Sequence, residues 1–273
     1  MAAAIDSLTS ATLKHLRERW WDDSFTEFLV ETLRPRPGNR ILDVGCGEGL
    51  AEVSIGRQHI SQIRLVGVDL VFSKIVEARA TTAAHNMRVA YAVADGCRLP
   101  FSAGAFDSIY CVAVLQHVGD VDAAVSEFAR VTRRGGRVVA VEPDNSARYA
   151  FSPTDAGQRA FEMSRRFFAA DAAELAVGPK LPALFARHGI EAIDVRLFPV
   201  SQVRLGAPPA AVWAERRAAI ERAAGHAPSH VQSLGRDYLN LLGAYEAEAA
   251  QAGPSFVEIQ NTMLFATVGQ RLG

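Results

Sequence analysis

The stretch that decides the fold of this chain is Ile41-Leu42-Asp43-Val44-Gly45-Cys46-Gly47-Glu48-Gly49-Leu50. A short apolar run meets an acid, and glycines then follow at alternate positions. This order predicts a buried strand, a tight turn and the first turn of a helix. Glycine allows positive φ and leaves room for a ligand to approach the backbone. The helix that follows would present free N–H groups and the positive end of its dipole to that ligand.

The spacing of the glycines separates this turn from two phosphate-binding turns. A dinucleotide-binding G-x-G-x-x-G would need glycine in place of Leu50, and no G-x-x-x-x-G-K-[ST] is present. Instead, Asp43 stands two positions before Gly45-x-Gly47-x-Gly49. This arrangement resembles motif I of the class I S-adenosylmethionine-dependent methyltransferases. A flexible glycine turn in some other α/β protein is the alternative reading.

Composition limits the class of protein and its partners. The chain has 273 residues, 49% of them apolar and 22% charged, so we expect a packed core with room for an added lid. The formal net charge of −1 argues against a chain-wide surface for nucleic acid, so no nucleic-acid partner is expected. Cys46, Cys97 and Cys111 are odd in number and lack metal-ligand spacing, which predicts a reduced intracellular protein without a metal.

Targeting signals are missing from the sequence as it stands. The first residues, Met1 to Asp6, contain no basic segment and no apolar run of signal length. No apolar stretch approaches the ~18 residues that suggest a membrane span. We therefore expect a cytoplasmic protein without a membrane span, acting as a monomer or a homodimer.

Strand and helix patterns alternate regularly between Arg40 and Glu142. We expect strands at 40–44, 65–69, 89–94, 106–112 and 137–142, and helices at 49–59, 73–85 and 122–130. Residues 133–136 are expected to form the turn into the fifth strand. Such alternation predicts an α/β fold with a doubly wound, mostly parallel sheet and right-handed crossovers. Ligands bind such sheets beyond the carboxyl ends of the strands, near the point where the strand order reverses.

The second half of the chain has weaker patterns. We expect helices at 154–170, 180–188, 209–224 and 229–251, and strands at 191–198 and 261–268. The resemblance implies seven strands, with the last one antiparallel between the fifth and sixth. It suggests a single domain, 1–273, with a helical cap (7–33), a Rossmann-like core (34–200 and 259–273) and a helical lid (201–258). Residues 145–178 would form a second wall beside that lid. An outward-packing decoration or a dimer surface is the alternative for the insert.

Acids end the second and third expected strands. A carboxylate at Asp69 could accept hydrogen bonds from both hydroxyls of a ribose. The resemblance implies that Asp95 binds the adenine amine and that the next N–H faces the ring. It also implies that an aromatic residue of the N-terminal helix contacts the cofactor, with Trp20, Trp21 and Phe25 as candidates. The expected contacts to S-adenosylmethionine, or to its product S-adenosylhomocysteine, are Asp43, Gly45, Cys46, Gly47, Gly49, Asp69, Leu70, Asp95, Gly96, Val112 and Trp21.

Further motifs narrow the resemblance. Leu99-Pro100-Phe101 precedes Phe106-Asp107, Leu115-Gln116-His117 follows the fourth strand, and Arg133-Arg134-Gly135-Gly136 leads into the fifth. Over about residues 38–145 these stretches are similar to the ubiquinone- and menaquinone-type methyltransferases. They bear on fold and cofactor, and they leave the methyl acceptor open.

The sequence argues against some classes of methyl acceptor. An Asn/Asp-Pro-Pro-aromatic run, used for base methylation in this superfamily, is absent where Cys111-Val112-Ala113-Val114 stands. The acids of a metal-assisted catechol site are incomplete, because only Asp144-Asn145 could supply them. We therefore expect a small-molecule methyl acceptor, a secondary or quinone-like metabolite methylated at oxygen, nitrogen, sulfur or carbon. The alternative is a protein of the same fold that binds the cofactor without methyl transfer, as a sensor, partner subunit or cyclase.

His117 is the candidate catalytic residue. It follows the fourth strand, so it would lie near the transferred methyl group, with Asp120 as the residue that would orient it. A neutral imidazole with an ordinary pKa of ~6.5 could take a proton from a hydroxyl or amine. A structural or cofactor-facing histidine is the alternative.

Overall fold

The computed structural model describes residues 21–59, 63–171, 176–225 and 227–273. Helices and strands follow one another in the order α3 (Asp23–Leu33), β1 (Arg40–Val44), α4 (Leu50–His59), β2 (Arg64–Asp69), α5 (Phe72–Ala84), β3 (Ala90–Val93), β4 (Phe106–Val112), the 3₁₀ turn η1 (Leu115–His117), α6 (Val121–Val131), β5 (Thr132–Phe151), α7 (Asp155–Asp171), α8 (Val177–Arg187), β6 (Ile190–Leu205), α9 (Ala210–Gly225), α10 (Ser229–Ala252), η2 (Gly253–Ser255) and β7 (Val257–Arg271).

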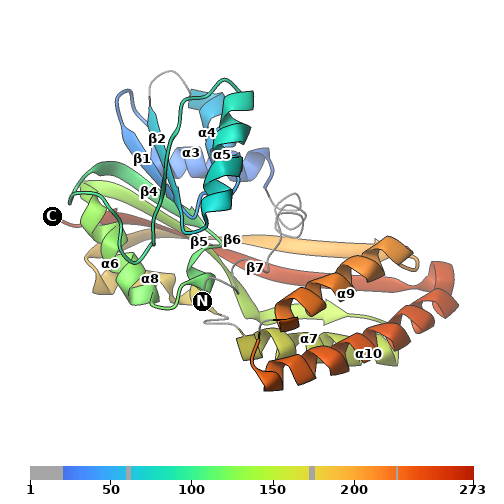
Figure 1. The fold of residues 1–273 in the computed structure, drawn as a ribbon. Coiled ribbons are helices and arrows are strands. Elements are labelled where there is room, and N and C mark those ends of the chain that lie inside the picture. Colours follow the sequence, from blue (N-terminus) through green and yellow to red (C-terminus); the bar gives the residue numbers. More distant parts are fainter. Residues whose placement is uncertain (1–20, 60–62, 172–175, 226) are drawn as a thin grey trace. The chain divides into compact units, whose positions relative to one another are not determined.

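The strands form one seven-stranded sheet in the order β3-β2-β1-β4-β5-β7-β6 (Figure 1). Strand β1 pairs in parallel with β2 and β4, and the same holds for β2 with β3 and β4 with β5. The last strand, β7, is antiparallel and lies between β5 and β6. The predicted seven-stranded, doubly wound sheet is confirmed, together with a helical insert between the last two strands.

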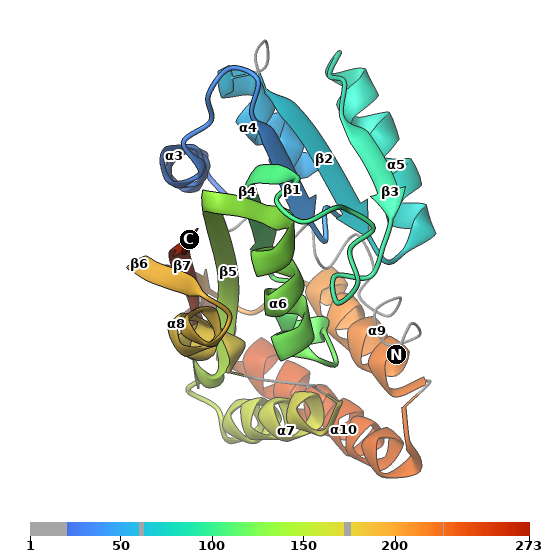
Figure 2. The same ribbon diagram turned by 90° about the vertical axis from the view of Figure 1, so that its left-hand side faces the viewer.

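The two halves of the sheet wind in opposite directions from its centre. The path β1-α4-β2-α5-β3 moves outward on one side of β1, whereas β4-α6-β5 moves outward on the other. Because both use right-handed crossovers, their helices cover opposite faces. Consistently, α3, α4 and α5 form one set of contacting helices and α6 and α8 another (Figure 2). The strand order reverses between β1 and β4, where a ligand site is expected.

Helix α6 illustrates why these residues fold as they do. Its side chains Ala124, Val125 and Phe128 recur at helical spacing and are buried. Asp120 caps its first turn by accepting a hydrogen bond from Ala123 N–H at 2.9 Å. A fully buried side chain of the size of Val or Phe stabilises the fold by about 1.5–3 kcal/mol, and a side-chain cap adds about 1 kcal/mol.

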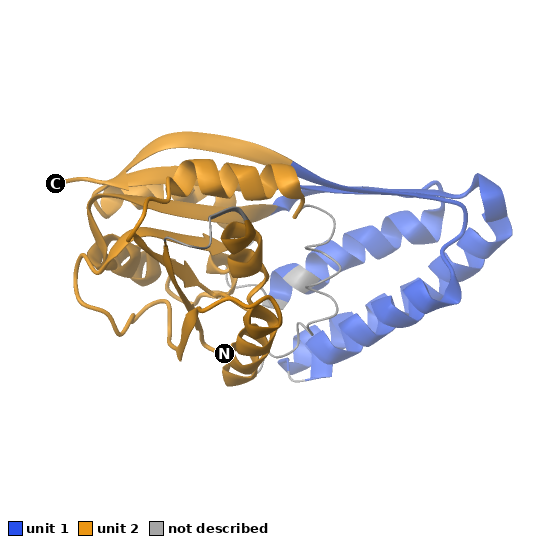
Figure 3. Cartoon of the chain, turned by 90° about the horizontal axis from the view of Figure 1, so that it is seen from above, with its two compact units in different colours: residues 1–19, 145–175, 199–263 blue, residues 20–144, 176–198, 264–273 orange. Residues whose placement is uncertain are grey.

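The chain divides into two compact units (Figure 3). One consists of residues 20–144, 176–198 and 264–273, and holds the glycine turn. The other consists of 1–19, 145–175 and 199–263, of which the structure describes 145–171, 199–225 and 227–263. Strands β5, β6 and β7 contribute residues to both units. That the whole chain is a single domain, with 201–258 as a lid, stays a prediction.

The second unit has its own core, formed by α7, α9, α10 and Phe256, which directly precedes β7. Tyr245 stands at its centre, with its ring 5.0 Å from that of Trp213 and 5.8 Å from that of Phe256. Phe167 is fully buried in the same cluster. Helices α9 and α10 fall where the sequence predicts them. The predicted second wall, 145–178, belongs to the same unit as far as residue 175.

A buried acid ties the helices of this second unit to β7. Glu258 is only 1% exposed, forms an ion pair with Arg216 and accepts a hydrogen bond from the Tyr245 hydroxyl at 2.8 Å. The Arg216 guanidinium also lies over the Trp213 ring, 4.7 Å from its centre. Burial alone would raise the pKa of Glu258, but Arg216, Tyr245 and Gln260 outweigh it, and the pKa is lowered.

Three strands are longer than predicted. Strand β5 runs to Phe151 rather than 142, β6 to Leu205 rather than 198, and β7 begins at Val257 rather than 261. Pro199 suggested the end of β6. However, β6 is the edge strand, and an edge strand tolerates proline because the missing N–H faces no neighbour.

The predicted turn at 133–136 is wrong. These residues lie within β5, whose register against β4 shifts between Phe106, opposite Thr132, and Ser108, opposite Arg137. The extra residues form a bulge, and Gly135 adopts φ +71° within it. In the predicted cap, residues 23–33 form α3, whereas 7–20, including Trp20, lie outside the described residues.

Candidate functional site

The glycine turn joins the end of β1 to β2 and to the loop after β4. Gly45, Gly47 and Gly49 all adopt positive φ, at 76°, 55° and 79°. The N–H groups of Gly45 and Cys46 both donate to the carbonyl of Val68, at 2.7 and 3.0 Å. A Cβ added at Gly45 would lie 2.3 Å from Val114 Cγ2. The turn therefore needs glycine for its backbone conformation and for its packing.

Asp69 stands where the sequence predicts a ribose contact. Its carboxylate accepts hydrogen bonds from Gly47 N–H at 3.0 Å and from Val71 N–H at 2.9 Å. An ionised carboxylate has about four acceptor positions, so about two remain for a ligand. The side chain is half-buried and open to solvent on one side.

Apolar side chains are exposed beside this acid. Leu70 is 43% exposed, Phe72 70% and Val93 49%. Val93 lies opposite Asp69 in the pairing of β2 with β3, so both residues lie at the same edge of the sheet. A flat aromatic group held at this edge would cover apolar surface that is otherwise in water.

The loop after β3 brings Asp95 and Gly96 to the same edge. Asp95 is exposed, and its Oδ1 accepts a hydrogen bond from Cys97 N–H at 2.9 Å. A Cβ on Gly96 would lie 3.3 Å from Val44 Cγ1 at the end of β1. Gly96 therefore lies next to the end of β1, where the glycine turn begins.

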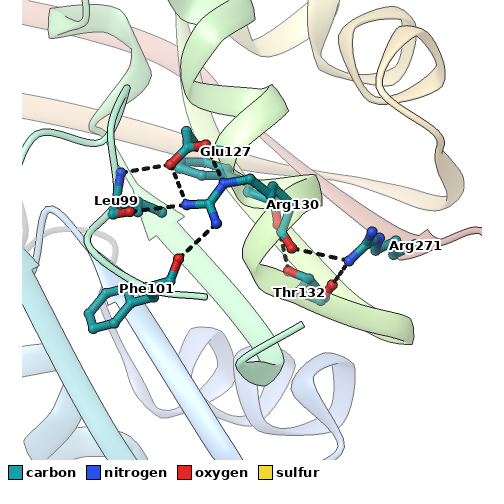
Figure 4. Close-up of polar contacts among 7 residues, drawn as sticks. Leu99, Phe101, Glu127, Arg130, Thr132 and Arg271 are labelled. Atoms are coloured by element: carbon teal, nitrogen blue, oxygen red, sulfur yellow. Dashed lines mark hydrogen bonds and ion pairs between the residues drawn. The ribbon is translucent and has the colours of Figure 1, made fainter. Parts of the chain in front are cut away.

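Two side chains of α6 fix the loop that follows (Figure 4). Glu127 accepts a hydrogen bond from Leu99 N–H at 2.7 Å. Arg130 donates to the carbonyls of Leu99 and Phe101, at 3.0 and 2.7 Å, and pairs with Glu127. The Leu99-Pro100-Phe101 motif thus has a structural explanation, because its backbone polar groups are satisfied by one guanidinium and one carboxylate.

A short turn with an unusual backbone follows β4. Val112 is buried, and Ala113 adopts φ +57°, which is uncommon outside glycine. The carboxylate of Glu142, at the end of the apolar run of β5, accepts hydrogen bonds from the N–H groups of Val114, Leu115 and Gln116 at 2.8, 2.7 and 3.3 Å. Glu142 is fully buried, and burial raises its pKa to about 7 against the opposing effect of these N–H donors.

His117 ends this turn at the same edge of the sheet. Its side chain is half-buried, and burial lowers its pKa, which keeps the imidazole neutral at pH 7. The orientation by Asp120 that the sequence suggests has no counterpart in the described residues, since no hydrogen bond joins the two side chains. The Asp120 carboxylate instead caps α6.

Other predicted contact residues are buried in the protein. Asp43 and Cys46 are each 3% exposed, and burial together with the nearby charge of Asp43 raises the pKa of the fully buried Tyr110. Burial, with the nearby charges of Glu52 and Asp43, raises the pKa of Cys46, so this thiol is not a reactive thiolate. Any contact of these two residues with a ligand is therefore through their backbone.

The two described aromatic candidates near the N-terminus, Trp21 and Phe25, differ in how exposed they are. The Trp21 ring packs edge-on against Phe25, with 5.0 Å between centroids, and its side chain stays partly exposed. Phe25 is 1% exposed and also contacts Phe198 at 5.3 Å, so it is a core residue. Trp21 is therefore the described candidate for a ligand contact.

Comparison with known proteins identifies the segment that holds the glycine turn. The family described as "Methyltransferase domain" matches residues 42–140, from β1 through the glycine turn to β5. Residues 42–140 are a class I methyltransferase domain. The predicted resemblance to S-adenosylmethionine-dependent methyltransferases is thereby confirmed.

Named relatives match 40–50% of the chain. An O-methyltransferase of Pyrenophora dematioidea is 36% identical over 112 residues, covering 40% of this chain and 41% of that protein. A demethylmenaquinone methyltransferase of Beutenbergia cavernae is 30% identical over 135 residues, covering 50% of this chain and 52% of that protein. The chain thus spans about half the length of the curated relatives that it matches.

Solved structures resemble the fold over most of the chain. The geranyl diphosphate C-methyltransferase of Streptomyces coelicolor, solved with Mg²⁺, geranyl diphosphate and S-adenosylhomocysteine, gives a TM-score of 0.52 at 16% identity. That match covers 91% of this chain and 80% of the other. At this identity the likeness concerns the fold.

The edge of the methyltransferase domain suits S-adenosylmethionine chemically. Asp69 keeps acceptor positions that no protein group occupies, Asp95 is exposed, and Leu70 and Val93 present apolar surface beside them. In the described ranges, no group of three potential metal ligands occurs and no helix is long and apolar enough to cross a membrane.

One residue at this edge escaped the sequence analysis. Glu142 lies just beyond the matched segment and is predicted from sequence only as the end of a strand. The signal that could have revealed it is a carboxylate directly after the buried apolar run Val138–Val141. An acid in that place must find hydrogen-bond donors inside the protein.

Proposed function

We propose that this chain transfers the methyl group of S-adenosylmethionine to a hydroxyl group of a small organic molecule. The observation that carries the proposal is where the methyltransferase domain places its polar groups. Its glycine turn, Asp69, Asp95 and His117 come to one edge of the sheet, at the reversal of strand order. The name of the O-methyltransferase relative supports an oxygen acceptor.

Different residues at this edge would bind different parts of the cofactor. Asp69 would bind the ribose through its free acceptor positions, while its bonds to Gly47 and Val71 keep it in place. Asp95 would accept from the adenine amine, and Leu70 would cover the ring. The tight turn at Gly45–Gly49 lets the backbone approach the amino-acid part of the ligand. Gly96, Val112 and Trp21 are proposed as further contacts.

For methyl transfer to a hydroxyl group, the protein has to align the two reactants and remove the hydroxyl proton. When bound, S-adenosylmethionine supplies a methyl group on a positively charged sulfur, which leaves in an in-line displacement. The chain must orient the acceptor oxygen, exclude water and take the hydroxyl proton. We assign proton removal to a ring nitrogen of His117, because burial keeps that imidazole neutral and able to accept.

A first experiment separates this proposal from its alternatives. Titration calorimetry should detect binding of S-adenosylmethionine and S-adenosylhomocysteine and no binding of NADH. Binding of NADH without the sulfonium compound would overturn the cofactor assignment. A competing outcome is tight cofactor binding without turnover, the behaviour of a sensor, a partner subunit or a cyclase of the same fold.

A second experiment addresses the acceptor. The protein is incubated with S-adenosylmethionine carrying a deuterated methyl group and with a panel of phenols, quinols, aliphatic alcohols, amines and thiols. Mass spectrometry then detects any product with a labelled CH3 in place of hydrogen. Products from hydroxyl compounds alone would support the proposal, whereas labelling confined to nitrogen, sulfur or carbon would redirect it.

A further inference from the structure

We propose that Glu142 is a positioning residue, whose carboxylate fixes the turn after β4 and thereby places the imidazole of His117. The inference rests on the proposed function only where it concerns methyl transfer. The geometry on which it is based lies entirely within residues 111–142 of one compact unit.

The hydrogen bonds of Glu142 define the turn. Its Oε1 accepts from both Val114 N–H and Leu115 N–H, at 2.8 and 2.7 Å, and its Oε2 accepts from Gln116 N–H at 3.3 Å. Consecutive N–H groups converge on one side chain only when the backbone turns sharply. His117 continues this turn, with its own N–H donating to the carbonyl of Val114 at 2.9 Å.

The backbone before the turn is strained, and the contacts made by the end of β5 hold it in this conformation. Ala113 adopts φ +57°, a left-handed conformation that costs a residue with a Cβ about 1–2 kcal/mol. The N–H of Ala113 is held by the carbonyl of Val141, next to Glu142 in the chain, at 2.8 Å. Such a strained conformation persists only where the surrounding contacts stabilise it by more than the strain costs. The end of β5 supplies those contacts.

A carboxylate suits this task better than other side chains do. It offers two acceptor oxygens and no donor, so it can serve all three N–H groups at once. Glutamine offers one acceptor, and its NH2 group would face an N–H. The ionised form, which predominates above the pKa of about 7, has a cost, since Glu142 is fully buried and no Lys or Arg of the described residues pairs with it. Such a destabilising buried charge is typical of functional sites.

The test compares Glu142→Gln, Glu142→Ala and Glu142→Asp with a matched control. Ser108→Ala removes another buried hydrogen bond, from Ser108 Oγ to the Leu33 carbonyl at 3.0 Å, near the opposite end of β4. It should weaken the fold without touching the turn. Any change that both Ser108→Ala and the Glu142 variants produce is therefore general destabilisation.

Two readouts are independent of enzyme activity. NMR follows hydrogen exchange of the amides of Val114, Leu115 and Gln116, and the titration of the His117 ring, whose signals are assigned with His117→Asn. In Glu142→Gln and Glu142→Ala we expect exchange of these amides to quicken at least ~10-fold and the His117 pKa to rise toward its ordinary ~6.5 as the ring is released to water. Glu142→Asp should retain part of the protection, and Ser108→Ala all of it.

The kinetic readout follows once an acceptor is known. In Glu142→Gln, kcat should fall at least ~10-fold while KM for the cofactor changes less than ~2-fold, because the misplaced group acts on the acceptor. A folded Glu142→Gln or Glu142→Ala protein whose amide exchange and His117 titration match those of Ser108→Ala would overturn the proposal. If the wild type binds no cofactor, the proposed function fails, and the NMR comparison still decides the role of Glu142.

Discussion

The N–H of Gly47 donates a hydrogen bond to the carboxylate of Asp69 at 3.0 Å, so the glycine turn and the acid that ends β2 are one connected structure. The second oxygen of the same carboxylate accepts from Val71 N–H at the start of α5. Removing this acid therefore has two effects, the loss of a ligand contact and the release of two backbone groups.

Asp69→Ala should lower affinity for S-adenosylmethionine by ~2–4 kcal/mol, the effect of losing a charged hydrogen-bonding partner. Titration calorimetry measures this loss. The fold should also lose about 1–3 kcal/mol of stability, measured by urea unfolding, because two backbone donors lose their acceptor. Asp69→Asn is the matched variant, since its amide oxygen can still accept from one N–H. Unchanged affinity in a folded Asp69→Ala protein would remove this residue from the site.

Gly45 and Val114 offer a test of packing in the glycine turn. Gly45→Ala places a Cβ 2.3 Å from Val114 Cγ2 and forces alanine into φ +76°. Gly104→Ala is the control, with φ +67° and its nearest contact at an ordinary 3.6 Å. We expect about 1–2 kcal/mol of destabilisation in the control from backbone strain and a further 1–3 kcal/mol at Gly45 from overpacking.

A double variant isolates the contact. If the extra cost of Gly45→Ala comes from Val114, then Gly45→Ala combined with Val114→Ala should recover most of it in a double-mutant cycle. Urea unfolding of the four proteins gives the coupling energy. Additive effects would mean that the clash is relieved in another way, for instance by movement of the whole turn.

The sequence predicts this turn well because its signals are local. Three glycines at alternate positions can be read within ten residues, and Asp69 and Asp95 are found because each ends a periodic pattern. The glycine turn and these two acids lie at one edge of the sheet because the carboxyl ends of parallel strands meet there. The structure adds that Asp43 and Cys46 are buried, which spacing cannot reveal, because a motif fixes the path of the backbone and not the exposure of each side chain.

The features that the sequence did not predict depend on contacts between residues that are far apart in the chain. Glu142 serves backbone groups 26 to 28 positions earlier, so no window of sequence contains both partners. The lengths of β5, β6 and β7 were missed because neighbouring strands, rather than local propensity, sustain them. The bulge at 133–136 has the composition of a turn, and only the pairing of β5 with β4 distinguishes the two.

Arg130 provides a test of the loop shown in Figure 4. Its guanidinium reaches the carbonyls of Leu99 and Phe101 and the carboxylate of Glu127 at the same time. Lysine has one ammonium group and cannot span these acceptors. We therefore expect Arg130→Lys to be nearly as harmful as Arg130→Ala, each costing about 1–3 kcal/mol in urea unfolding. A lysine variant as stable as the wild type would show that charge alone holds the loop.

In the other compact unit, Glu258 is the residue to test. Arg216→Ala leaves this buried carboxylate without its cation and should destabilise the unit by about 3–5 kcal/mol, whereas Tyr245→Phe removes one hydrogen bond and should cost about 1–3 kcal/mol. Because the pKa of Glu258 is lowered, the stabilisation is present above its unfolded value and is lost as pH falls through the folded value. Thermal unfolding between pH 3 and 7 should show this loss in the wild type and not in Glu258→Gln.

The pH dependence linked to Glu142 has the opposite sign. Burial raises its pKa from the ordinary 4.5 to about 7, so between these values the native state holds a proton that the unfolded chain has released. The stabilisation is complete below pH 4.5 and is lost as pH rises through about 7, a change of about 3 kcal/mol at ~1.36 kcal/mol per pH unit. The neighbouring group that faces this carboxylate from β4 is the Cys111 thiol, 4.0 Å from Oε1, and burial and Glu142 itself raise the pKa of that thiol.

His117 works against this trend, because its pKa is lowered and its contribution to stability grows as pH rises toward ~6.5. The two effects are separated by urea unfolding of the wild type, Glu142→Gln and His117→Asn at pH 5 and pH 8. Glutamine cannot ionise, so relative to the wild type Glu142→Gln should gain about 2.5 kcal/mol of stability between the two pH values. The same comparison for His117→Asn should show a shift with the opposite sign. A wild type and a Glu142→Gln variant whose stabilities run parallel from pH 5 to pH 8 would mean that Glu142 is ionised throughout, held so by the N–H groups of the turn.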